Sequence, residues 1–259
     1  MKTQTLSPAQ AAKLFLSPQR KADAPSTPPF PDAERVELEF EGGKLVYWQA
    51  GKGLTVLVLH GWEGTAADMV PFIPSLLNSG FRVVALEFPA HGGSDGKITS
   101  LFQCTRAVTH AATQIGAIDA VLAHSVGCAV AVEAMKAGIH PKAAVLIATP
   151  ARYKDYALQF GMLAGLDKEG IQQMIEDLRA LGVDVTAINT PEAVKTLDVP
   201  ALLVHSDDDR VILQAIGQEV ANAWQGAKFM PVSGLGHRKI LSAPAVVDAA
   251  VSFIQAKAR

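Results

Sequence analysis

Ser125 stands where a buried strand is expected to turn into a helix, a position from which a hydroxyl can act as a nucleophile. It follows the apolar run Ala120–Ala123 and precedes a stretch of small residues that begins at about Val126. A sharp turn there would project the hydroxyl from the sheet edge. The amino end of the helix would stabilise negative charge beside it, and Gly127 would let the helix approach the strand closely. The alternative interpretation is a serine that only caps the helix.

A serine hydroxyl needs a base to take its proton and a third group to orient that base. His237 is the candidate base, because it lies in a glycine-flanked loop after the predicted strand Lys228–Val232. Acidic residues follow the buried run Ala201–Val204, and among them Asp209 is the best placed and Asp208 the second. The alternative for these aspartates is a solvated cluster that caps the helix expected from residue 212.

Four segments of the chain resemble motifs of the α/β-hydrolase family, in the order in which the family has them. They cover a nucleophile turn similar to G-x-S-x-G, with Ala123 for the first glycine, an H-G-aromatic loop, a loop similar to G-H-G-x-S, and a glycine-flanked histidine. In the same order as these four motifs, the segments are residues 123–127, 60–64, 88–96 and 231–238. The resemblance covers about residues 35–257.

The resemblance implies a serine hydrolase with Ser125, Asp209 and His237 as its catalytic triad. The backbone N–H groups of Trp62 and Val126 would form the oxyanion hole. The expected reaction is cleavage of a carboxylic ester or thioester of a small apolar substrate through an acyl-enzyme on Ser125, with no cofactor and no metal. Alternatives are a triad-bearing small-molecule receptor with little turnover, or another reaction of this fold such as acyl transfer or C–C bond hydrolysis.

The elements that must position these residues are readable from the apolar pattern. A hairpin is predicted for residues 36–48, where polar and apolar residues alternate before Gly42-Gly43. Continuous apolar runs predict strands buried on both faces, and segments of helical period separate them. The runs are 55–59, 83–86, 120–123, 143–147 and 201–204, and the helical segments include 100–116, 126–138 and 212–224. With the resemblance, this predicts an α/β-hydrolase fold: a mostly parallel sheet of about eight strands with helices on both faces.

Two segments lie outside the motifs. Residues 1–34 are predicted to form an N-terminal arm, with a helix over 7–16 followed by an extended Pro-rich stretch. Residues 35–259 form the expected hydrolase domain. Within it, residues 151–198 interrupt the strand–helix rhythm and predict a small helical cap insertion, or alternatively ordinary crossover helices.

Composition excludes several classes of function. The formal net charge is −2 and no basic face is apparent, which argues against a nucleic-acid partner. No apolar stretch has the length of a signal peptide or a membrane span, so a cytoplasmic protein is expected. Cys104 and Cys128 are interpreted as buried reduced thiols; nothing calls for a disulfide, and no ligand spacing suggests a metal. The sequence predicts a small ester-like substrate and does not indicate the oligomeric state.

Overall fold

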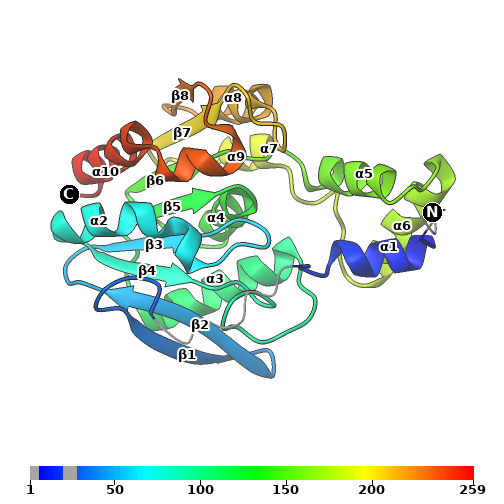
Figure 1. Ribbon diagram of the computed structural model, residues 1–259, viewed down its shortest axis with the longest axis horizontal. Helices are drawn as coiled ribbons and strands as arrows, with labels where there is room; N and C mark the ends of the chain where they lie inside the picture. Colours follow the sequence, from blue (N-terminus) through cyan, green and yellow to red (C-terminus); the bar gives the residue numbers. More distant parts are fainter. Residues whose placement is uncertain (1–5, 20–27) are drawn as a thin grey trace.

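The chain builds one eight-stranded sheet, and the computed structural model describes residues 6–19 and 28–259. The strand order is β1-β2-β4-β3-β5-β6-β7-β8, in which β1 and β2 pair antiparallel and β3 to β8 run parallel (Figure 1). The strands are β1 (Glu34–Phe40), β2 (Gly43–Ala50), β3 (Thr55–Leu59), β4 (Arg82–Leu86), β5 (Ala120–His124), β6 (Ala143–Ile147), β7 (Ala201–Ser206) and β8 (Lys228–Val232). The predicted α/β-hydrolase fold with a mostly parallel sheet is thereby confirmed.

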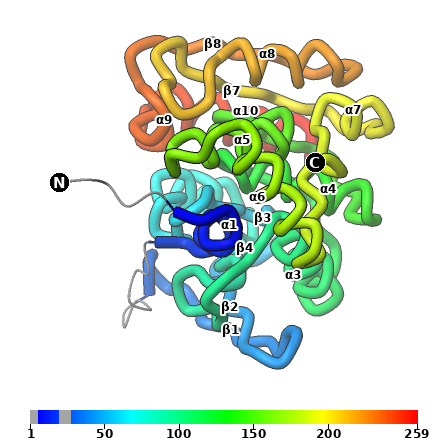
Figure 2. Tube along the Cα trace, turned by 90° about the vertical axis from the view of Figure 1, so that its right-hand side faces the viewer, coloured from blue at the N-terminus to red at the C-terminus, as the bar shows by residue number. Residues whose placement is uncertain are grey.

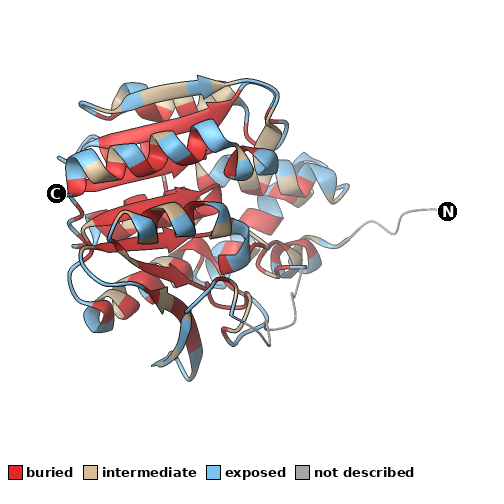
Figure 3. Cartoon of the chain, turned by 60° about the vertical axis from the view of Figure 1, so that its left-hand side comes forward, coloured by how far each residue is buried: buried red, intermediate tan, exposed pale blue. Residues whose placement is uncertain are grey.

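The central strands are buried on both faces, as their continuous apolar runs require (Figure 3). Successive side chains of a strand point to opposite faces. In β3, Leu57 and Leu59 belong to one hydrophobic cluster, and Val56 and Val58 belong to the other. The sheet therefore separates two cores, each of which needs its own layer of helices.

Helices cover both faces of the sheet. On one face lie α3 (Leu101–Ile115), α4 (Val126–Lys136) and α8 (Gln214–Ala223), whose apolar residues join the first core. On the other lie the 3-10 segment η1 (Ala66–Phe72), α2 (Ile73–Asn78) and α10 (Pro244–Ala258). The shorter elements are α7 (Thr190–Val194), α9 (Gly236–Lys239) and η2 (Ile240–Ser242).

The segment between β6 and β7 stands beyond the carboxyl ends of the parallel strands. It contains α5 (Tyr153–Leu163) and α6 (Lys168–Ala180), separated by a turn at Gly165. The N-terminal helix α1 (Pro8–Phe15) packs against both of them (Figures 1 and 2). This placement is the one a cap would occupy, and that residues 151–198 act as a cap remains a prediction.

The predicted helix over residues 7–16 is confirmed with its start signal. Ser7 is the N-cap of α1: its hydroxyl accepts a hydrogen bond from Gln10 N–H, and its own backbone N–H donates to Gln10 Oε1. Of the Pro-rich stretch predicted to be extended, residues 20–27 lie outside the described part of the chain. Pro28 and Pro29 precede an irregular turn that leads into β1.

Within residues 6–19 and 28–259, no single helix has the length and apolarity to cross a membrane. One bent pair, Gly236–Ser242 followed by Pro244–Ala258, meets that criterion by length and composition only.

Candidate active site

Ser125 occupies a strained turn between β5 and α4. Its φ of 53° and ψ of −125° lie in a region that L-residues rarely adopt, which costs on the order of 1–3 kcal/mol. The hydroxyl makes no capping hydrogen bond to the helix, so the helix-cap interpretation has no support. The Ser125 side chain is instead directed toward the histidine loop, although the residue is only 3% exposed.

Gly127 explains how the turn can be so tight. A Cβ at this position would lie 2.5 Å from the carbonyl oxygen of His60 and 2.8 Å from that of Leu59. Both obstacles are backbone atoms, which cannot move aside. As expected from the sequence, the glycine lets the first turn of α4 lie directly against the end of β3.

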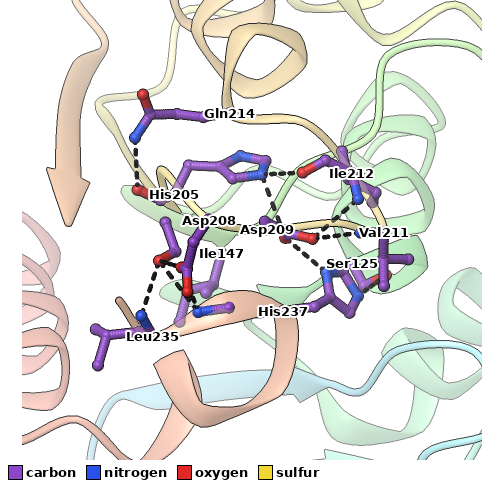
Figure 4. Close-up of polar contacts among 12 residues, drawn as sticks. Ser125, Ile147, His205, Asp208, Asp209, Val211, Ile212, Gln214, Leu235 and His237 are labelled. Carbon is purple, nitrogen blue, oxygen red and sulfur yellow. Dashed lines mark hydrogen bonds and ion pairs between the residues drawn. The ribbon is translucent and has the colours of Figure 1, made fainter. Parts of the chain in front are cut away.

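Three side chains from distant parts of the chain form one hydrogen-bonded series (Figure 4). His237 Nε2 lies 3.1 Å from Ser125 Oγ, and His237 Nδ1 lies 2.7 Å from Asp209 Oδ2. With Nδ1–H donating to the carboxylate, Nε2 is left unprotonated and accepts the serine proton. The structure thus brings together the three residues that the sequence nominated, in the spacing required of a nucleophile, its base and an orienting acid.

Asp209 is held in place as an ionised group. It is 2% exposed, and its Oδ1 accepts hydrogen bonds from Val211 N–H at 2.8 Å and Ile212 N–H at 3.0 Å. Burial by itself raises the pKa of Asp209, but hydrogen bonds from His205, His237 and the Ile212 backbone outweigh it and hold the pKa below its ordinary value. The carboxylate is therefore available as a charge partner for an imidazolium.

The neighbouring acids hold the loop that carries the histidine. Asp208 Oδ1 accepts hydrogen bonds from Gly236 N–H at 2.7 Å and from the Ser206 hydroxyl at 2.6 Å. Asp207 accepts one from Gly234 N–H at 3.2 Å. Helix α8 begins several residues later without a side-chain cap, so the helix-capping alternative for these aspartates is wrong. Asp209 faces His237, and Asp208 contacts the backbone before it.

His205 is a site residue that sequence reasoning missed. It lies at the end of β7, buried, with Nε2–H 2.8 Å from the carbonyl oxygen of Ile212 and 3.4 Å from Asp209 Oδ2. A Cβ at Gly217 would lie 2.2 Å from its Nδ1, so α8 packs directly on the ring. A histidine directly after an apolar run carries no local signal of this role, because the turn that follows brings its partner Asp209 to it.

His124 contacts the backbone of His237, the candidate base. Its Nε2–H donates to the backbone carbonyl of His237 at 2.9 Å, and burial lowers the pKa of His124 to about 3. A neutral imidazole next to His237 adds no competing positive charge.

The loop after β3 lies against the nucleophile. A Cβ at Gly61 would lie 3.1 Å from Ser125 Cβ, so the following peptide, which carries the Trp62 N–H, approaches the serine closely. Among the described residues neither the Trp62 N–H nor the Val126 N–H has a hydrogen-bond acceptor. Two free backbone donors beside a nucleophile form the arrangement expected of an oxyanion hole.

Buried histidines brace this loop. His60 Nδ1–H donates to the Gly61 carbonyl at 2.7 Å, while its Nε2 accepts from Phe88 N–H at 3.1 Å. His91 Nε2 accepts from Glu63 N–H at 3.1 Å. The segment 88–96 therefore contacts the loop that carries the Trp62 N–H.

Two cavities lie at the site: Ser125 lines the smaller one, and its neighbour Val126 lines the larger one. One of about 140 Å³ is lined by Ser125 and His237 together with the polar side chains Asp68, Arg238 and Ser242. The other, of about 200 Å³, is lined by the aromatic side chains Phe15, Trp62, Tyr153, Tyr156 and Phe160. Trp62 borders both cavities. The site thus has a smaller compartment with several polar side chains and a larger, mainly aromatic one.

The other groups considered for reactive chemistry are the two cysteines and a metal site. Cys104 and Cys128 are buried and form no disulfide, and burial raises the pKa of each thiol to about 12. In the described part of the chain, no group of three or more His, Cys, Asp or Glu side chains is placed to hold a metal ion.

The fold and this geometry define a protein of the α/β-hydrolase class, and comparison with known proteins agrees. The model of the Alpha/beta hydrolase family matches residues 56–250, and the chain belongs to that family. An esterase of Pyrococcus furiosus has a similar structure, with a TM-score of 0.72 at 20% identity over 93% of this chain and 99% of that one.

Other similar structures differ in their described activities. A thioesterase domain of the curacin biosynthetic pathway has a TM-score of 0.64 at 18% identity, covering 87% of this chain and 99% of that one. A putative non-heme bromoperoxidase of Mycobacterium tuberculosis has a TM-score of 0.66 at 19% identity, covering 82% and 96%. At these identities the likeness concerns the fold alone. A search of curated protein sequences found no match.

Proposed function

We propose that the chain is a serine hydrolase that cleaves carboxylic esters or thioesters through an acyl-enzyme on Ser125. The observation that carries this proposal is the continuous series from Ser125 Oγ through His237 to Asp209, with separations of 3.1 and 2.7 Å. The two unoccupied N–H donors beside the serine support it, because an acyl transfer develops negative charge on the carbonyl oxygen.

In the proposed reaction, Ser125 Oγ attacks the carbonyl carbon while its proton passes to His237 Nε2. Asp209 stabilises the imidazolium, and the N–H groups of Trp62 and Val126 bind the oxyanion. His237 then protonates the departing oxygen or sulfur, which leaves with the electrons of the broken bond. Water attacks the acyl-enzyme with the same histidine as its base, which releases the acid and restores Ser125.

Two readouts test this proposal. The wild-type protein should hydrolyse p-nitrophenyl acetate with multiple turnovers and should be labelled by a fluorophosphonate probe. Replacing Ser125 by Ala should abolish both, while circular dichroism confirms an unchanged fold. Full labelling of Ser125→Ala would contradict the assignment of the nucleophile. A burst of one product per site without steady state would favour the receptor alternative.

A further inference from the structure

The apolar cavity beside the serine has a wall from outside the hydrolase domain. Leu14 and Phe15 at the end of α1 line it, opposite the oxyanion residues Trp62 and Val126. Helix α1 precedes the residues that match the family model, so family membership does not supply this wall.

The chemistry of the proposed reaction assigns the two cavities. His237 must reach the leaving group to protonate it, and among the two compartments it lines only the smaller, polar one. The acyl substituent then extends the other way, past the N–H donors of Trp62 and Val126, into the apolar compartment.

Resting on the proposed function, we infer that α1 is the outer wall of the acyl pocket and that Leu14 and Phe15 restrict it to compact apolar acyl groups. A cavity of about 150 Å³ lined by aliphatic and aromatic side chains accommodates benzene. The present pocket of about 200 Å³ therefore suits an aryl or short alkyl group rather than a long chain.

Several contacts hold this wall in position. The Phe15 ring stacks on Tyr153 at 5.4 Å between centroids and meets Phe160 edge-on at 5.3 Å, both from α5. Gln19 N–H donates to Glu63 Oε1 at 2.8 Å, next to the oxyanion donor Trp62. Because the arm is fixed both to α5 and to the oxyanion loop, its side chains can set the size of the pocket.

The test uses p-nitrophenyl alkylphosphonates, in which the alkyl group takes the place of the acyl substituent. Ser125 Oγ bonds to phosphorus, p-nitrophenolate leaves with the bond electrons, and His237 retains the serine proton. The coloured product measures the inactivation rate without requiring turnover. Rates are compared for methyl, hexyl and decyl phosphonates in the full-length protein.

Two substitutions at the end of α1 should change the phosphonate rate ratios in opposite ways, and a third serves as the control. Leu14→Trp should fill the pocket and lower the hexyl-to-methyl rate ratio about tenfold, and Phe15→Ala should open it and raise the decyl-to-hexyl ratio about tenfold. Leu16→Ala is the matched control, because Leu16 is also buried but does not line the described part of this cavity. Unchanged ratios in both pocket variants, or equal changes in Leu16→Ala, would overturn the inference.

A binding measurement separates this inference from the proposed function. In Ser125→Ala, benzyl alcohol should quench the fluorescence of Trp62, with Trp62→Phe as the reference for the other tryptophans. The quenching should persist with Leu16→Ala and disappear with Leu14→Phe, which fills the pocket without adding a second indole. If no phosphonate reacts but this pattern holds, the proposed function fails and the pocket wall stands. If phosphonates react and no quenching occurs, the pocket wall is wrong.

Discussion

At the residue scale, the three consecutive aspartates that follow β7 make different contacts. Asp209 is buried and faces His237, whereas Asp208 and Asp207 contact the backbone of the preceding glycine loop. An orienting acid acts by holding the imidazole tautomer and stabilising its charged form. Residues that only hold the loop affect the base indirectly, so substitutions at the two kinds of aspartate should differ in size.

Asp209→Asn should lower kcat for p-nitrophenyl acetate by about 10⁴, because the amide favours the wrong imidazole tautomer. Asp208→Asn is the matched control, and its effect should be much smaller, since the amide oxygen can still accept the Gly236 N–H bond. Steady-state kinetics of both variants measure the difference. A larger loss in Asp208→Asn would exchange the two assignments.

At the element scale, the site depends on how closely α4 approaches β3. The first turn of the helix lies against the backbone of Leu59 and His60, and only a glycine at position 127 leaves room. The same approach sets the distance between Ser125 and the loop that carries the Trp62 N–H. Packing of these two elements therefore determines both local stability and the geometry of the nucleophile.

Gly127→Ala should destabilise the protein by about 3 kcal/mol, at the upper end of overpacking costs, because the new methyl group meets fixed backbone atoms. Gly170→Ala in α6 is the matched control: its nearest obstacle is Asp167 Oδ1, a side-chain atom of the helix cap at 3.1 Å, and no backbone atom is among its nearest neighbours. There the change should cost little or stabilise, by up to about 1 kcal/mol, through higher helix propensity. Urea denaturation of both variants measures the difference, and equal losses would refute the explanation.

At the scale of the whole molecule, a buried acid at the end of β4 links stability to pH. Glu87 is fully buried; its Oε1 accepts a bond from Ala66 N–H at 3.2 Å, while Oε2 has no partner among the described residues. Burial raises the pKa of Glu87 from 4.5 to about 7, against smaller opposing contributions from Ala66, Trp48 and Arg35. The folded protein therefore holds this proton more tightly than the unfolded chain.

The sign of the pH effect follows from linkage. Below about pH 4.5, Glu87 is protonated in both the folded and the unfolded state, so its burial does not lower the stability through ionisation. Between pH 4.5 and about 7, Glu87 ionises in the unfolded chain but stays protonated in the folded protein. The free energy of unfolding therefore falls as the pH rises through this range. The stability difference between Glu87→Gln and wild type should grow by about 3 kcal/mol in favour of the variant as the pH is raised from about 4 to about 8. Urea denaturation at both pH values measures this, and a difference independent of pH would contradict the shifted pKa.

Much of the fold and three of the site residues were predictable from local pattern. Apolar runs marked the central strands because both faces of a parallel sheet are buried, and Ser125 and Asp209 each follow such a run. His237 follows the shorter predicted strand Lys228–Val232. The helix start at Ser7 was likewise encoded by neighbouring residues. Each of these features depends on residues close together in the chain.

The tertiary structure decided what depends on contacts between distant segments. Ser125 and His237 are separated by 112 positions, and only packing showed that Asp209 rather than Asp208 faces the histidine. The contact of His205 with Asp209 and the placement of Phe15 in the cavity lined by Trp62 and Val126 had no local signal. A helix at 7–16 was predictable because capping and periodicity are local, whereas its position at the edge of the apolar cavity is set by its packing on α5 and α6.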